Sequence, residues 1–97
     1  MAKMPDEKTL DKMESLLNIA SDYTRLKILY AISNGDLCVN DIVKLVGASQ
    51  SLVSHQLKVL RKAKLVATHK EGTKVYYKLD DEHVLALLDI VYSHVSE

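Results

Sequence analysis

The sequence predicts a mainly α-helical chain with one small β-hairpin, folded as a single domain over residues 1–97. Three observations predict this class. Apolar residues recur at helical spacing over most of the chain, two β-prone runs flank Gly72, and 97 residues are too few for two separate cores. The five aromatic residues are all Tyr, so the core must consist of Leu, Val, Ile and Ala. A core of this kind is small, and oligomerisation commonly stabilises such domains.

Short connections join the expected elements. These are a loose tail over 1–7, helices over 8–20, 22–32 and 39–45, a longer helix over 49–63 that includes its cap, a hairpin over 65–79, and a last helix over 81–97. Ser21 or Asp22 can cap the second helix, and Asn34-Gly35-Asp36 ends it. Gly47 ends the third helix, and Ser49 caps the fourth.

The hairpin and the last helix are marked by a change of hydrophobic period. Residues 65–70 and 74–79 contain β-branched and aromatic side chains, and Glu71-Gly72-Thr73 between them predicts a three-residue loop. Asp80 or Asp81 can cap the final helix. Its apolar residues return at helical spacing and form one stripe: Val84, Leu87, Leu88, Val91 and Val95.

The formal charge is zero overall but unevenly distributed along the chain. Residues 49–78 contain seven basic residues and one acidic residue, a net charge of +6, so the remainder carries −6. A basic middle flanked by acidic ends is typical of a nucleic-acid-binding surface. A solvated basic face has the same composition, and charge alone does not separate the two interpretations.

The order of elements is that of a winged helix-turn-helix: a short helix, a Gly turn, a long helix with a polar N-terminus and a basic hairpin. Such a long helix fits the DNA major groove, where Gln, Ser and His side chains can contact the edges of the nucleobases. The Lys and Arg residues farther along the chain are expected to contact phosphates. The predicted DNA-binding residues are Gln50, Ser51, Ser54, His55, Lys58, Arg61, Lys62, Lys70 and Lys74. Taken singly, each is better explained as a cap or an exposed side chain; the combination favours DNA binding.

Three segments resemble the ArsR/SmtB family of metal-sensing bacterial repressors: residues 36–42 (DLCVNDI), 49–57 (SQSLVSHQL) and 75–77 (VYY). The likeness extends from the first helix to the C-terminus, and the V-S-H-Q-L run is its most specific part. The resemblance implies a homodimer, joined through its N- and C-terminal helices. Such a dimer binds double-stranded, inverted-repeat operator DNA and releases it when an inducer ion binds.

The last helix carries four candidate metal ligands, Asp81, His83, His94 and Glu97. Two imidazoles and two carboxylates suit Zn²⁺, with Co²⁺ or Cd²⁺ as surrogates. His83 and His94 are eleven residues apart, about 16 Å along a helix, so they cannot hold one ion within one chain. An antiparallel helix of a second subunit places Asp81 and His83 beside His94 and Glu97, twice per dimer.

The same four positions match the zinc site on the C-terminal helix of SmtB/CzrA-type sensors, which the resemblance therefore implies here. Each residue taken alone is more simply a solvated surface side chain, with Asp81 suited to a helix N-terminus. The interpretation depends on all four occurring together.

Two other residues with metal-ligating side chains are not expected to bind an ion. Asn40 stands where the thiolate-using sensors of the family have the second Cys of a Cys-Val-Cys pair, so Cys38 is expected to be a small buried residue. A disulfide between the Cys38 residues of two subunits remains an alternative. Another alternative is a repressor that responds to a different metal or to a thiol signal and retains the four ligands without using them. His69 is expected near phosphate or without a role.

Other function classes fit less well. Catalytic zinc keeps an open coordination position, and the chain lacks nucleophile motifs, a Gly-rich phosphate loop and HExxH, so we do not expect an enzyme. A dimerisation module without DNA binding remains an alternative, which the salt dependence of DNA binding distinguishes. With no long apolar segment and no signal peptide, we expect a cytoplasmic protein without a membrane partner.

Overall fold

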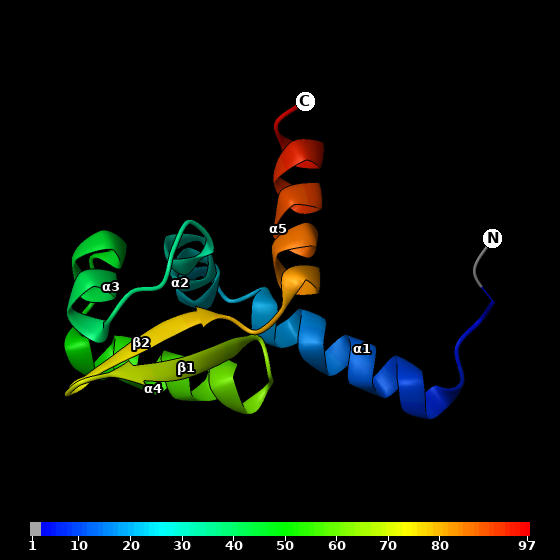
Figure 1. Ribbon diagram of the computed structural model, residues 1–97. Helices are drawn as coiled ribbons and strands as arrows, with labels where there is room; N and C mark the ends of the chain where they lie inside the picture. The colour runs from blue at the N-terminus through cyan, green and yellow to red at the C-terminus, as the bar shows by residue number, and fades with distance from the viewer. Residues whose placement is uncertain (1–2) are drawn as a thin grey trace.

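The structure, a computed structural model of the chain, describes residues 3–97. These residues form five helices and one two-stranded antiparallel sheet, so the predicted fold class is confirmed. The elements in chain order are α1 (Glu7–Ala20), α2 (Tyr23–Ser33), α3 (Val39–Val46), α4 (Gln50–Lys62), β1 (Val66–Glu71), β2 (Lys74–Leu79) and α5 (Glu82–Val95). Figure 1 shows α2, α3 and α4 gathered with the hairpin, while α1 extends away from them and the C-terminal end of α5 projects freely.

The first helix begins one residue earlier than expected. Asp6 Oδ1 accepts a hydrogen bond from the backbone N–H of Thr9 at 2.8 Å, and this bond lowers the pKa of Asp6 below its usual value. Glu7 therefore belongs to α1 and not to the expected tail over 1–7. Residues 1 and 2 of that tail lie outside the described part of the chain.

Side-chain caps also decide where three later helices begin. Asp22, and not Ser21, caps α2 by accepting a backbone N–H at 3.0 Å. Ser49 caps α4 in the same way at 3.1 Å. Asp81, and not Asp80, caps α5. Each of these side chains satisfies a backbone N–H that has no partner inside its own helix.

The hairpin loop is shorter than the sequence predicted. In the antiparallel register Glu71 lies opposite Lys74, so only Gly72-Thr73 connects β1 to β2. The predicted three-residue loop is therefore wrong, because Glu71 belongs to the strand. Gly72 has a φ of +64°, a left-handed conformation at the first position of a two-residue turn. Turns of that kind match the right-handed twist of the paired strands.

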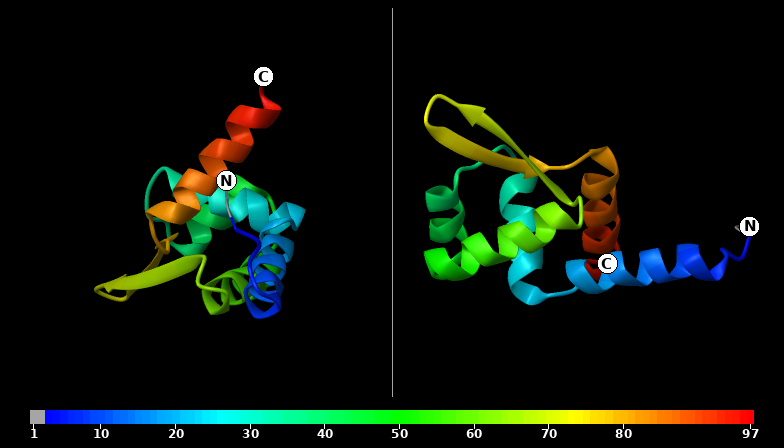
Figure 2. Two further views of the ribbon diagram at one scale, coloured as in Figure 1. Left: turned by 90° about the vertical axis from the view of Figure 1, so that its right-hand side faces the viewer. Right: turned by 90° about the horizontal axis from the view of Figure 1, so that it is seen from below.

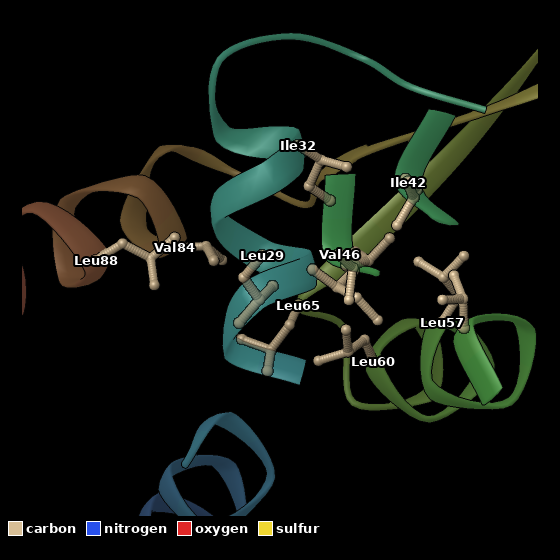
Figure 3. Packing of buried hydrophobic residues seen from close by; sticks show 12 residues of the cluster. Leu29, Ile32, Ile42, Val46, Leu57, Leu60, Leu65, Val84 and Leu88 are labelled. Carbon is tan, nitrogen blue, oxygen red and sulfur yellow. The ribbon is translucent and has the colours of Figure 1, made fainter. Parts of the chain in front are cut away.

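The core consists of aliphatic side chains only, as composition required. Its buried members are Ile28, Leu29, Ile32, Ile42, Val46, Val53, Leu57, Leu60, Leu65, Val66, Val84 and Leu88. Figure 3 shows that α2 lies at the centre of this cluster, with Val84 and Leu88 of α5 on one side and Leu57 and Leu60 of α4 on the other. The core therefore joins α4 and α5 through α2.

The two terminal helices leave apolar surface uncovered. No residue of α1 is buried, and Leu10, Met13 and Leu17 are about half exposed. In α5 the predicted apolar stripe is buried only in its first half, whereas Val91 is 44% and Val95 73% exposed. In Figure 2 the left view shows α5 reaching out of the body of the protein, and the right view shows α1 doing so. None of the helices in residues 3–97 is long and apolar enough to cross a membrane.

Candidate nucleic-acid interface and metal centre

The long helix α4 separates an inner apolar side from an outer polar side. Val53, Leu57 and Leu60 are buried in the core, as their helical spacing predicted. The side chains predicted to face DNA are exposed: Gln50, Ser51, Ser54, His55, Lys58, Arg61 and Lys62. Since the N-terminal cap and the buried stripe fix the rotation of α4, the polar side faces solvent along its whole length.

The polar side of α4 and the hairpin share one hollow. It has a volume of about 360 Å³ and is lined by Ser54, His55, Leu57, Lys58, Arg61 and Tyr77. Two cationic side chains, a hydroxyl and an imidazole are the groups that contact DNA phosphates. The hollow therefore joins the outer face of α4 to β2 in one surface that can follow a nucleic-acid backbone.

A backbone bridge anchors the hairpin to the body. The backbone N–H of Leu37 donates to Tyr77 at 3.1 Å, and that of Tyr77 donates back to Leu37 at 2.7 Å. The two wing lysines predicted to bind DNA, Lys70 and Lys74, are exposed, as is Lys78 of β2, and Figure 2 shows the hairpin projecting from the body. The wing thus holds three lysine charges away from the core, beside the exposed side of α4.

His69 lies between two carboxylates, which the sequence did not predict. Its Nδ1 is 3.4 Å from Asp36 Oδ2 and its Nε2 is 3.7 Å from Glu71 Oε1, while its ring stacks on Tyr76 at 5.5 Å. The two nitrogens point to opposite sides of the ring, so one ion cannot bind both nitrogens and both carboxylates. Asp36 and His69 are 33 residues apart in the sequence, and no local pattern connects them.

Two of the four predicted metal ligands lie together at the start of α5. Asp81 Oδ1 is 3.4 Å from His83 Nδ1, and both side chains are at least half exposed. Asp81 has extended backbone geometry, with φ −154° and ψ 177°, which brings its side chain back toward the first helical turn. The same oxygen accepts the backbone N–H of His83 at 2.8 Å. Asp81 therefore caps the helix and faces the imidazole at once.

The other two predicted ligands lie at the far end of the same helix. His94 is in the last turn of α5 and Glu97 follows the C-cap Ser96, and both are exposed. No group of three or more His, Cys, Asp or Glu side chains within residues 3–97 is placed to hold one metal ion. The helix itself separates the two pairs, since 14 residues rise about 20 Å. The imidazole and carboxylate donors nevertheless fit zinc chemically, two from each end.

Cys38 is only half buried, so the prediction of a small buried residue is wrong in part. It occupies the N-cap position of α3, and its thiol donates to Asp41 Oδ2 at 3.1 Å. The thiol lines an open hollow of about 490 Å³ together with residues of α3, α4 and β2. Its position at the turn before α3, where the chain must leave the core, accounts for the partial exposure.

Four polar side chains within residues 3–97 take part in long-range hydrogen bonds that the sequence did not predict. They are Arg25, Lys27 and Tyr30 of α2 and Gln56 of α4. One signal for Gln56 is present in the sequence, since it lies three residues after Val53 and four before Leu60, on the inner side of α4. An amide at such a position requires a partner inside the protein. No signal identifies the partner.

The fold and these surfaces define a winged helix-turn-helix DNA-binding protein. The model of the bacterial regulatory protein family arsR matches residues 22–68. A transcriptional repressor SmtB homolog from Synechocystis is 36% identical over 96% of this chain and 73% of its own length. The chain therefore belongs to the ArsR family, as its resemblance indicated. Members of this family are transcriptional regulators and not enzymes, in agreement with prediction.

Other relatives extend the comparison. A cadmium resistance regulatory protein CadC homolog from Staphylococcus aureus is 42% identical over 79% of this chain, which spans 64% of that relative's length. The structure of a homodimeric winged helix-turn-helix DNA-binding domain from Mycobacterium bovis matches with a TM-score of 0.85 and 29% identity, over 100% of this chain and 92% of that one. Reduced HlyU from Vibrio cholerae matches with a TM-score of 0.83 and 31% identity, over 94% of this chain and 96% of that one.

Proposed function

We propose that this ArsR-family regulator is a zinc-responsive repressor. In this proposal a metal-free homodimer binds an inverted-repeat operator in the bacterial cytoplasm, and it releases the DNA when zinc binds between its subunits. The observation that carries the proposal is the division of four suitable ligands into two pairs at opposite ends of α5, with Asp81 and His83 already 3.4 Å apart. Each pair needs two further ligands, and a second copy of the helix supplies them.

Uncovered apolar surface on the terminal helices supports the dimer. Leu10, Met13 and Leu17 on α1 and Val91 and Val95 on α5 are partly or largely exposed in the single chain. Apolar surface of this kind marks protein–protein contact sites. The M. bovis domain with the same fold is described as homodimeric. A two-fold dimer in which the α5 helices run antiparallel covers these side chains and generates two equivalent sites.

In such a dimer, each metal site takes two ligands from one subunit and two from the other. Asp81 and His83 of one subunit and His94 and Glu97 of its partner bind the ion. The imidazoles bind in their neutral form, and the two carboxylates offset the charge of Zn²⁺. Occupied sites fix the two α5 helices relative to each other, and thereby fix the two α4 helices at a spacing that fits the operator less well.

DNA binding in this proposal uses the outer side of α4 and the wing. The exposed residues at the start of α4, among them Gln50 and Ser54, contact base edges in the major groove. Lys58, Arg61 and the wing lysines Lys70 and Lys74 contact phosphates. The arrangement is supported by the hollow that Ser54, Lys58 and Arg61 share with Tyr77 of β2.

An operator-binding assay tests the proposal. Fluorescence anisotropy with the DNA upstream of the protein's own gene measures the operator Kd in chelator and in saturating zinc. We expect zinc to weaken binding by at least about fivefold, the lower end of ordinary allosteric coupling. Because coupling is reciprocal, operator DNA must weaken zinc binding by the same factor. A complex that persists unchanged in saturating zinc contradicts release by zinc.

A different inducer is the second candidate, because a relative at 42% identity is named a cadmium resistance regulator. Titration with Co²⁺ distinguishes the candidates by coordination geometry and ligand type. Tetrahedral absorption that disappears in both His83→Ala and His94→Ala indicates the α5 site. Absorption bands from sulfur coordination that disappear in Cys38→Ala indicate a thiolate site and contradict the zinc proposal.

A further inference from the structure

The helix α2 makes polar contacts with α4, which carries the proposed DNA-contacting residues, and with α5, which carries the proposed metal ligands. Figure 3 shows it between α5 and α4, with Leu29 and Ile32 facing into the core. Apolar contacts in a core are not directional, so they resist separation of the helices more than small rotations or shifts. Hydrogen bonds are directional and fix the position of one helix on another. The polar contacts of α2 are therefore the ones that relate the placement of α5 to that of α4.

One of these contacts joins α2 to the middle of α5. The hydroxyl of Tyr30 donates to the carbonyl of Leu88 at 2.7 Å, and the ring of Tyr30 lies 6.5 Å from that of Tyr92. Leu88 comes five residues after His83 and six before His94. The hydrogen bond therefore holds α5 near its midpoint, between the two ends that carry the proposed metal ligands.

The other contact joins the start of α2 to α4. Arg25 Nε donates to Gln56 Oε1 at 2.5 Å, and its Nη1 lies 3.5 Å from the carbonyl of Ile19 at the end of α1. The backbone N–H of Arg25 is itself held by the cap Asp22 at 3.0 Å. Gln56 lies next to His55, one of the residues proposed to contact DNA. The guanidinium thus connects the end of α1, the start of α2 and the inner side of α4.

We propose that α2 couples the metal helix to the DNA-reading helix, with Tyr30 and Arg25–Gln56 as positioning residues at its two contacts. The inference rests on the proposed zinc response and identifies the side chains that carry it. When metal binding shifts α5, the bond from Tyr30 to Leu88 moves α2 with it, and the Arg25–Gln56 bond passes the shift to α4. Neither contact includes a proposed metal ligand or a proposed DNA-contacting residue.

Two variants remove the contacts with little change in volume. Tyr30→Phe keeps the ring and removes only the hydroxyl, and Gln56→Leu removes the amide. Tyr23→Phe is the matched control, because Tyr23 is on the same helix and its hydroxyl makes no hydrogen bond within residues 3–97. For each full-length protein we would measure thermal unfolding, tetrahedral Co²⁺ absorption, and the operator Kd with and without zinc.

We expect both variants to bind Co²⁺ and, without metal, operator DNA as the wild type does. The factor by which zinc weakens operator binding should fall from at least about fivefold toward one in both, and remain at the wild-type value in Tyr23→Phe. The double variant should lose no more coupling than the larger single loss, because both contacts belong to one route.

A wild-type zinc factor in Tyr30→Phe or in Gln56→Leu overturns the inference, whatever the change in melting temperature. If one variant does not fold, the other decides. A wild-type protein that binds Co²⁺ tetrahedrally but shows no zinc effect on the operator contradicts the proposed function, and the coupling route falls with it. A wild type that responds while the variants respond equally leaves the proposed function intact and rejects only α2 as the route.

Discussion

At the scale of single residues, side chains in this protein serve more than one contact at a time. Asp81 caps α5 and faces His83 with the same oxygen, Oδ1. Arg25 contacts three elements through its backbone and its guanidinium. Spacing in the sequence limited the cap of α5 to Asp80 or Asp81, because caps obey local rules, and the structure selected Asp81. The partners of Arg25 and Tyr30 were not predictable, because they lie 31 and 58 residues away.

Substitution of Asp81 separates its two roles. Asp81→Asn keeps a side-chain oxygen that caps the helix, so the free energy of unfolding should stay near the wild-type value. Asp81→Ala should lower it by about 1 kcal/mol, because the cap is removed. Both variants should bind zinc more weakly, since each lacks the carboxylate charge. Chemical denaturation measures the effect on stability, and zinc titration measures the effect on metal binding. If Asp81→Asn binds zinc as tightly as the wild type does, Asp81 is a helix cap and not a metal ligand.

The hydroxyl of Tyr30 predicts a pH effect on stability. Burial, with the nearby charge of Asp89, raises the pKa of Tyr30 above its ordinary value. The contribution of the neutral hydroxyl is complete below the pKa of the unfolded chain and is lost as pH rises through the folded value. As pH rises above about 10, the ordinary pKa of tyrosine, the wild type should therefore lose more stability than Tyr30→Phe. Parallel denaturation profiles for the two proteins contradict this assignment.

At the scale of elements, local sequence signals located the helices and strands. They failed where contacts with other parts of the fold determine strand ends and burial. Ser49 caps α4 as predicted, Asp22 is the one of the two predicted candidates that caps α2, and the hydrophobic period located α4 and the strands. The hairpin loop was predicted one residue too long, because Glu71 gains a cross-strand partner in Lys74 that its own propensity does not indicate. In α5 a periodic apolar stripe did not lead to burial, since only its first half meets the core.

The wing is expected to contribute affinity without sequence preference. Lys70→Ala and Lys74→Ala should weaken binding to operator and unrelated DNA alike, because phosphate contacts carry no sequence information. The slope of log K against log salt should fall by about 1 for each lysine that no longer neutralises a phosphate. Gln50→Ala provides the contrast, since it should reduce the preference for operator with little change in slope. An unchanged slope in both lysine variants places the wing away from the DNA backbone.

At the scale of the whole molecule, the single chain is incomplete as a metal site within residues 3–97 and leaves apolar faces on α1 and α5 uncovered. The apolar faces are uncovered because α1 and the second half of α5 extend beyond the common core, and the predicted ligands are divided because they lie at opposite ends of α5. In the proposed function, a second subunit covers the apolar faces and also supplies the other two ligands of each site. Dimerisation, metal binding and DNA spacing are therefore properties of the same interface in the proposed function.

A charge placed in that interface should produce monomers. Val91→Glu puts a carboxylate on the apolar stripe of α5, where burial in a dimer leaves it unpaired. Light scattering should then report the 10.9 kDa mass of one chain, and affinity for the inverted repeat should fall to that for a single half-site. Leu45→Glu is the control, because Leu45 is 65% exposed on α3 and outside the proposed interface. A Val91→Glu protein that stays dimeric removes α5 from the interface.

Sequence alone determined the class of fold, the aliphatic core, the polar face of α4 and the family, because these follow from periodicity, caps and short motifs within a few residues of one another. Only the tertiary structure decided that α2 lies between α5 and α4, that His69 faces Asp36, and that half of the α5 stripe is exposed. Those contacts join residues distant along the chain, and their geometry depends on how all the helices pack at once.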